Sequence, residues 1–148
     1  MRTIDTQITI DAPCHIIWHH LTEFSKYPEW NTFIGPISGK LQTGEKLDVM
    51  INPPGGKAMR FKPTVTKFEA GRALSWLGSL GIKGIFDGEH IFTCEALDES
   101  KSLFTQKENF SGILVPILWN SMYAKTVKGF ELMNQQLKER AEKDAWGR

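Results

Sequence analysis

The residues best suited to chemistry lie on two neighbouring segments in the second half of the 148-residue chain. His90 lies in the segment 85–97, and Gln106 and Glu108 lie in the segment 102–111. A carboxylate beside an imidazole selects the tautomer of the ring and raises its pKa, so the two groups can exchange a proton with a bound molecule. His90 and Glu108 are therefore candidate acid–base residues, and Gln106 is a candidate for orienting a ligand.

Both segments alternate in polarity, which predicts two strands with one face turned toward the interior. The more apolar face carries Phe86, Gly88, His90, Phe92 and Cys94 on the first strand, and Phe104, Gln106, Glu108 and Phe110 on the second. Polar side chains placed there must be hydrogen-bonded or each cost about 1–3 kcal/mol. They either satisfy one another in a filled core or line a cavity and orient the polar end of a ligand. A single β-bulge would reverse the assignment.

Other candidate sites are weaker. His15 and His19 are four residues apart and share a helix face, a spacing that can bind a metal, but no third ligand is nearby. A solvated helix face is the better interpretation, and we expect neither a metal nor a cofactor. Cys14 and Cys94 form no close chelating pair and are interpreted as free, mostly buried thiols, with a disulfide between them left open.

The elements that must position these residues follow from the periodicity. Residues 4–10 alternate as a strand does, and two short helices are expected after them, over about 14–24 and 26–30. Further strands are expected at 34–41, 47–51, 58–69, 73–79, 85–97 and 102–111. The turn at Asn52 to Lys57 contains two prolines and two glycines and is a candidate lid over a cavity.

A long amphipathic helix is predicted over about 115–142, because apolar residues recur there every three or four positions. The members of this stripe that we expect to contact a ligand are Trp119, Met122, Tyr123, Phe130 and Met133. The residues 144–148 are expected to form a disordered tail, which leaves a single domain over 1–143.

The predicted fold class is α+β, with a curved antiparallel sheet of six or seven strands wrapped around the C-terminal helix. A gap between such a sheet and its helix is where a ligand would bind, in a cavity of about 300 Å³ or more. Phe61 and Trp76, on other predicted strands, complete the candidate lining.

Composition limits the class of function. The chain has 41% hydrophobic and 24% charged residues and a net charge of +1, which is typical of a soluble globular protein. This charge balance indicates neither a nucleic-acid surface nor an anionic-membrane surface. The longest apolar run covers only residues 113–119, whereas a membrane span needs about twenty residues. No secretory signal is visible, so we expect a cytoplasmic protein.

Four local motifs carry a resemblance to a known family. They are Ile10-Asp11-Ala12-Pro13 followed by Ile17-Trp18, then Phe24-Ser25-Lys26-Tyr27-Pro28-Glu29-Trp30-Asn31, Phe86-Asp87-Gly88-Glu89-His90 and Glu108-Asn109-Phe110-Ser111-Gly112. With the order of elements, they resemble the START-like or SRPBCC superfamily of polyketide cyclase-like proteins, over residues 3–140. The resemblance implies the helix-grip fold and a hydrophobic cavity for a lipid, polyketide, steroid or other apolar metabolite. It implies no fixed catalytic triad.

Three functions follow. The leading hypothesis is a non-enzymatic binder of a small hydrophobic molecule, acting as a monomer or homodimer without a nucleic-acid partner. The second is an enzyme of the cyclase or dehydratase type that uses His90 and Glu108. The third is a co-chaperone-like interaction module, which predicts an exposed apolar patch around Ile85, Ile91 and Leu103.

Overall fold

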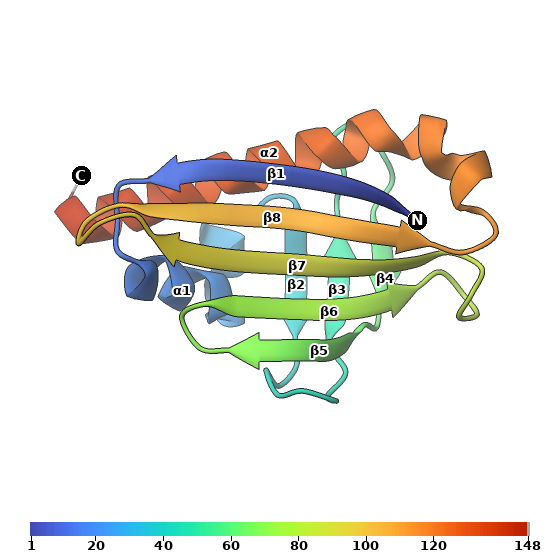
Figure 1. The fold of residues 1–148 in the computed structure, drawn as a ribbon, viewed down its shortest axis with the longest axis horizontal. Helices are drawn as coiled ribbons and strands as arrows, with labels where there is room; N and C mark the ends of the chain where they lie inside the picture. Colours follow the sequence, from blue (N-terminus) through green and yellow to red (C-terminus); the bar gives the residue numbers. More distant parts are fainter. Residues whose placement is uncertain (148) are drawn as a thin grey trace.

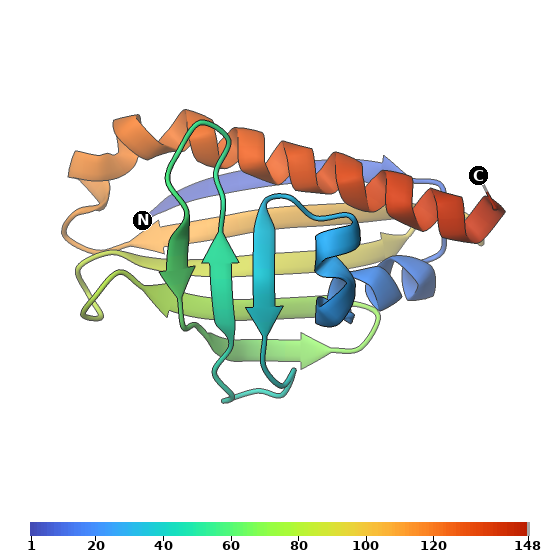
Figure 2. The same ribbon diagram turned by 180° about the vertical axis from the view of Figure 1, so that it is seen from behind.

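The computed structural model describes residues 1–147, and its eight strands form two antiparallel sheets (Figure 1). The larger sheet has the strand order β1-β8-β7-β6-β5. Its strands are β1 (Arg2–Ile10), β5 (Thr64–Glu69), β6 (Ala73–Ser79), β7 (Asp87–Ala96) and β8 (Ser102–Ser111). The smaller sheet contains β2 (Ile34–Ser38), β3 (Asp48–Ile51) and β4 (Met59–Phe61). In Figure 2 the strands of the small sheet cross those of the large sheet at a steep angle.

The predicted α+β class and the antiparallel pairing are confirmed, but the prediction of one sheet with six or seven strands differs from these eight strands in two sheets. The segment 58–69, predicted as one strand, is divided between β4 and β5. Pro63 stands at the division, where it has no N–H to donate to a ladder. Its carbonyl accepts a hydrogen bond from Leu47 N at 2.8 Å, so the chain turns here from the small sheet to the large one.

Both predicted short helices are present, as α1 (Cys14–Thr22) and the 3₁₀ helix η1 (Phe24–Glu29). The long helix α2 (Val115–Trp146) continues beyond its predicted end, and Gly147 stops it with a left-handed φ of 68°. The tail expected at 144–148 is therefore helical from residue 144 to residue 146, and residue 148 lies outside the described residues. Contacts described below hold these last turns in place.

Helix α2 lies along the large sheet on the same side as the small sheet, so the three layers enclose one interior (Figure 2). Phe92 and Phe104 on the large sheet and Phe130 and Met133 on α2 are fully buried between them. Phe33, at the start of the small-sheet region, packs against the helix where residue 129 is glycine. A Cβ on Gly129 would lie 2.2 Å from the Phe33 ring, so this close approach requires glycine.

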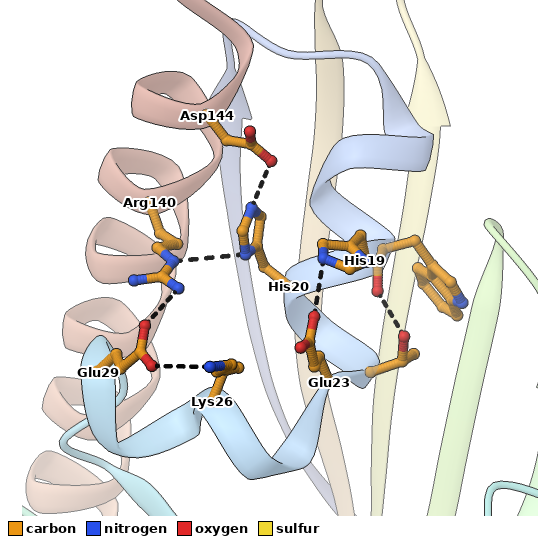
Figure 3. A network of polar contacts seen from close by, with 9 residues as sticks. His19, His20, Glu23, Lys26, Glu29, Arg140 and Asp144 are labelled. Carbon is orange, nitrogen blue, oxygen red and sulfur yellow. Dashed lines mark hydrogen bonds and ion pairs between the residues drawn. The ribbon is translucent and has the colours of Figure 1, made fainter. Parts of the chain in front are cut away.

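A polar network fastens the C-terminal half of α2 to α1 and η1 (Figure 3). His20 Nε2 and Asp144 Oδ2 are 2.8 Å apart, and Arg140 Nη2 donates to Glu29 Oε1 at 2.8 Å. Arg140 Nε also donates to His20 Nδ1 at 3.4 Å, so the proton of His20 is on Nε2, facing Asp144. Trp146 Nε1 donates to the carbonyl of Asp11. This end of the molecule is closed by these contacts.

Candidate functional site

A cavity of about 220 Å³ lies between the two sheets and the N-terminal half of α2. The small sheet supplies one wall, with Val49, Ile51 and Phe61, and the large sheet supplies the opposite wall. Pro53, in the loop predicted as a lid, is part of the lining. The cavity is smaller than the 300 Å³ expected from the sequence, because Phe92, Gln106 and the rest of the interior beside it are close-packed.

The cavity gathers eight of the thirteen predicted ligand-binding residues. Those in the lining are Phe61, Trp76, Phe86, His90, Glu108, Phe110, Met122 and Phe130. Phe92, Gln106 and Met133 are buried in the core beside it, and Trp119 and Tyr123 lie on α2 outside the lining. The alternation of β7 and β8 thus predicted the inward orientation of His90, Gln106 and Glu108 correctly.

Twelve lining residues were missed, and half of them come from the small sheet and its connections. They are Phe33, Val49, Ile51, Pro53, Met59, Pro63, Gly78, Leu80, Gly88, Leu118, Ser121 and Thr126. The alternation of Val49 and Ile51 was a usable signal, because it marks the inward face of that strand. Which layer this face covers depends on the division of the chain at Pro63, which periodicity alone does not reveal.

The lining is apolar apart from four side chains, and two of these have their hydrogen bonds within their own helix. Ser121 Oγ donates to Leu118 O at 2.9 Å, and Thr126 Oγ1 donates to Met122 O at 2.9 Å. The other two, His90 and Glu108, pair directly across β7 and β8. They are the ionisable groups of the cavity.

A chain of hydrogen bonds fixes which nitrogen of His90 carries the proton. Thr6 Oγ1 donates to the backbone carbonyl of Gln106 at 2.7 Å, so this hydroxyl must accept from Asn134 Nδ2, 2.9 Å away. Asn134 Oδ1 then accepts from Gln106 Nε2 at 2.8 Å, and Gln106 Oε1 faces His90 Nε2 at 2.8 Å. Because that oxygen can only accept, neutral His90 has its proton on Nε2. Its Nδ1 is an unprotonated acceptor.

Glu108 faces this acceptor from the next strand. Its Oε1 is 3.6 Å from His90 Nδ1, which is too long for a direct hydrogen bond. Only 18% of the side chain is exposed, and burial raises the pKa of Glu108 to about 8. Gly88 makes room for the carboxyl group, since a Cβ there would lie 2.1 Å from Glu108 Oε2. At neutral pH this carboxyl is therefore mainly protonated and can donate a hydrogen bond.

Aromatic rings enclose the imidazole. The ring centroids of Phe92, Phe130 and Trp76 lie 4.5, 4.9 and 5.5 Å from that of His90. Burial among them lowers the pKa of His90 to about 4, and the hydrogen bond to Gln106 opposes this shift only in part. His90 is thus neutral near pH 7. The cavity offers a ligand one neutral donor and one neutral acceptor in apolar surroundings.

The other candidate groups lie apart from the cavity. His19, whose side chain is 61% exposed, lies 2.8 Å from Glu23 on the outer face of α1. Cys14 and Cys94, eighty positions apart in sequence, approach each other where α1 meets β7, and the Cys14 thiol donates to Ser102 Oγ at 3.4 Å. Both thiols are free, and burial raises the pKa of Cys94. Ile85, Ile91 and Leu103, the proposed interaction patch, are each partly buried.

Comparison with known proteins agrees with this architecture. The family model described as polyketide cyclase / dehydrase and lipid transport matches residues 1–142. No curated protein is similar enough in sequence to be matched. Among residues 1–147, no helix combines the length and the apolarity needed to cross a bilayer.

Solved structures with low sequence identity have the same fold. The hypothetical protein jhp0584 from Helicobacter pylori has a TM-score of 0.78 at 17% identity, with 95% of this chain and 88% of that chain covered. The Zhui aromatase/cyclase from Streptomyces sp. R1128 has a TM-score of 0.77 at 11% identity, with coverages of 96% and 94%. The di-domain ARO/CYC StfQ from the steffimycin biosynthetic pathway has a TM-score of 0.76 at 12% identity, with 97% of this chain and 52% of that chain covered.

Proposed function

Because the chain belongs to the family of polyketide cyclases, dehydrases and lipid transport proteins, we propose that it binds a small apolar molecule between its sheets and α2. The ligand has one or two rings and carries a hydroxyl or carbonyl group at one end. The observation that carries this proposal is a 220 Å³ apolar cavity whose two ionisable groups, His90 and Glu108, are both held neutral.

The size of the ligand follows from the volume. A dry apolar cavity of about 150 Å³ is enough to bind benzene, so 220 Å³ fits a molecule of one to two rings. Apolar burial supplies most of the affinity, at roughly 25 cal/mol per Å² before the costs of association. The lining rings of Trp76, Phe86 and Phe110 suit a flat ligand.

The polar end of the ligand follows from the chemistry of the pair. Protonated Glu108 donates to a carbonyl or hydroxyl oxygen, and His90 Nδ1 accepts from a hydroxyl. An anionic ligand is disfavoured, because the described lining residues include no lysine or arginine to pair with its charge. The pair therefore selects a neutral phenol or ketone.

Paired probes test this selectivity. We expect 2-naphthol to bind about five- to tenfold more tightly than naphthalene in calorimetric titrations at pH 7, the effect of one or two additional hydrogen bonds. Glu108→Leu removes most of this preference and keeps naphthalene binding, whereas Glu108→Gln keeps a donor and part of the preference. Glu95→Leu, at an exposed position of β7, is the control and should leave both affinities unchanged. Failure of the wild-type chain to bind either probe contradicts the proposal.

A second candidate is a dehydratase that forms an aromatic ring, favoured by the 3.6 Å separation of His90 Nδ1 and the Glu108 carboxyl. His90 Nδ1 would remove a proton from the carbon next to a ketone, and Glu108 would protonate the departing β-hydroxyl as water. The proton then passes from the imidazolium to the carboxylate, which restores both neutral groups. This chemistry needs the two pKa values on either side of neutrality, as they are here.

The probe for this candidate is 3-hydroxy-1-tetralone, which becomes fluorescent 1-naphthol on loss of water. An enzyme should give a rate that is level between about pH 4 and pH 8 and falls outside these limits, where His90 is protonated or Glu108 ionised. His90→Gln should abolish turnover but retain probe binding. If water is lost no faster with the protein than in buffer alone, the protein binds a ligand but does not catalyse this reaction.

A further inference from the structure

The balanced total charge conceals a strong asymmetry along the molecule. Three segments, 49–66, 73–86 and 109–130, contain six Lys and Arg residues and no Asp or Glu. They include much of the cavity wall, the β3–β4 and β6–β7 loops and the first half of α2, whereas Glu108 of the cavity wall and buried Asp87 of β7 lie outside them. The second half of α2, residues 131–146, contains four acidic and three basic residues, and the β7–β8 turn at 97–101 contains two acidic residues and one lysine. The three segments are therefore purely basic, whereas the opposite end carries both signs with a small acidic excess.

Four lysines at the basic end are exposed: Lys57 in the β3–β4 loop, Lys83 in the β6–β7 loop, and Lys125 and Lys128 on α2. Within residues 1–147, none of them lies within ion-pair distance of a carboxylate. The β3–β4 loop contacts α2, since a Cβ on Gly56 would lie 3.6 Å from Lys125 Cδ. These charges are available to an anionic partner.

Large aliphatic side chains project from the same end. Ile82 in the β6–β7 loop is 76% exposed, Ile113 just before α2 is 70% exposed, and Ile117 in the first turn of α2 is 72% exposed. Isolated exposed aliphatic residues are ordinary, but three that stand on neighbouring segments at one end of the molecule are not. None of the three lines the cavity, whereas Leu80 and Leu118 beside them do. These isoleucines therefore stand next to the cavity and face outward.

The two loops that carry them are fixed to each other. Ile113 N donates to Gly84 O at 3.1 Å, and Leu114 N donates to Ile85 O at 2.9 Å. Gly112 has a left-handed φ of 119°, and a Cβ there would lie 2.4 Å from Ile85 O, so glycine is needed for this close approach. Figure 1 shows both loops and the start of α2 together at one end of the molecule. The isoleucines thus form one preorganised surface.

We propose that this end docks on an anionic lipid bilayer, with Ile82, Ile113 and Ile117 inserted among the acyl chains and the four lysines at the headgroups. Protruding aliphatic side chains at the same end as exposed lysines, with the carboxylate of Asp87 buried and bonded to Gly84 N, match the depth profile of an anionic membrane surface. An acidic protein partner would be better matched by aromatic residues, methionine and arginine, because protein interfaces are enriched in these and depleted in lysine. Docking would place the cavity, proposed above as a ligand site, next to the lipid phase, from which an apolar ligand can enter.

Vesicle co-sedimentation tests the proposal with the full chain. The probes are vesicles of phosphatidylcholine alone and vesicles with about 30% phosphatidylglycerol. We expect binding to the anionic vesicles only, and weaker binding when salt rises from about 0.1 M to about 0.5 M. The double variant I82E/I113E should lower partitioning by about tenfold or more, because it replaces two inserted aliphatic side chains with charges. The control L97E changes a leucine that is 52% exposed in the β7–β8 turn, at the other end, and should bind as the wild type does.

The outcomes separate this proposal from the proposed ligand site. The variant I82E/I113E should still bind 2-naphthol in solution, since neither residue lines the cavity. Vesicle binding without 2-naphthol binding would retain the membrane surface and contradict the ligand site. Equal losses for I82E/I113E and L97E, or no binding to anionic vesicles, would overturn membrane docking. Binding to polyglutamate without binding to vesicles would also overturn membrane docking, and it would indicate an acidic protein partner instead.

Discussion

At the scale of single residues, Glu108 and His90 face each other and would carry opposite charges if both were ionised, yet burial favours the neutral form of both. The distance of 3.6 Å between Glu108 Oε1 and His90 Nδ1 provides too little attraction to offset the loss of hydration. The proton on His90 Nε2 is held by Gln106, whose own amide is oriented by Asn134. The cavity therefore holds a neutral donor, Glu108, beside a neutral acceptor, His90, and an uncharged polar ligand can hydrogen-bond to both.

The raised pKa of Glu108 predicts a stability that falls with pH. Its pKa is 4.5 in the unfolded chain and about 8 in the folded one, so its favourable contribution is complete below 4.5 and is lost as the pH rises toward 8. His90 acts in the opposite sense between about 4 and 6.5, because its folded pKa is the lower one. From pH 6.5 to 8 the titration of Glu108 outweighs the remaining titration of His90 in the unfolded chain, and we expect the free energy of unfolding to fall by about 1–1.5 kcal/mol.

Chemical denaturation at several pH values across this window measures the effect. Glu108→Gln should remove this fall between pH 6.5 and 8, since the amide does not titrate. Glu95→Gln, at an exposed position of β7, should behave as the wild type does. A wild-type stability that is constant over the window would mean that Glu108 is ionised in the folded protein.

At the scale of elements, the strands and helices could be predicted where one residue pattern determines them. The alternation of β7 and β8 predicts their inward faces, and the stripe on α2 predicts the long helix. The division of 58–69 at Pro63 could not be derived in the same way, because proline is also compatible with the edge of a single sheet. The bond between His90 and Gln106 was one of the two alternatives that the sequence offered, but the partners Thr6 and Asn134 were not predictable, since they come from opposite ends of the chain.

The contact between α2 and the small-sheet region predicts an unusual response to a helix substitution. Gly→Ala inside a helix normally stabilises it by about 0.5–1 kcal/mol. At Gly129 the new methyl group would meet the Phe33 ring at 2.2 Å, and that ring is buried and also lines the cavity. We expect Gly129→Ala to destabilise the protein by about 1–3 kcal/mol through overpacking.

Thermal unfolding of Gly129→Ala beside Asn120→Ala measures this effect. Asn120 is an exposed position of the same helix, where alanine should be neutral or slightly stabilising. Binding of 2-naphthol should also weaken in Gly129→Ala, because Phe33 must move toward the cavity. A stabilised Gly129→Ala variant would show that the ring can move aside without cost.

At the scale of the whole molecule, the two ends have different roles. The polar network of His20, Glu29, Arg140 and Asp144 closes one end and ties α2 to α1 and η1 (Figure 3). The cavity lies at the other half of α2, where the lining includes no member of that network. The last turns of α2 contact α1 and the β1–α1 connection but do not line the cavity. Substitutions at this end should therefore change stability without changing ligand affinity.

Truncation after Lys143 tests this separation. It removes Asp144, the partner of buried His20, and Trp146, whose indole donates to the carbonyl of Asp11. An unpartnered buried donor costs about 1–3 kcal/mol, so we expect the free energy of unfolding to fall by this amount. Asp144→Asn keeps an oxygen acceptor for His20 and should lose much less stability.

The affinity of the truncated chain for 2-naphthol, measured where it and the wild type are both folded, should match that of the wild type, because the removed residues do not touch the cavity. If the truncated chain is as stable as the wild type, the last turns of α2 do not stabilise the fold. If it is folded but binds 2-naphthol more weakly, the closed end also shapes the cavity.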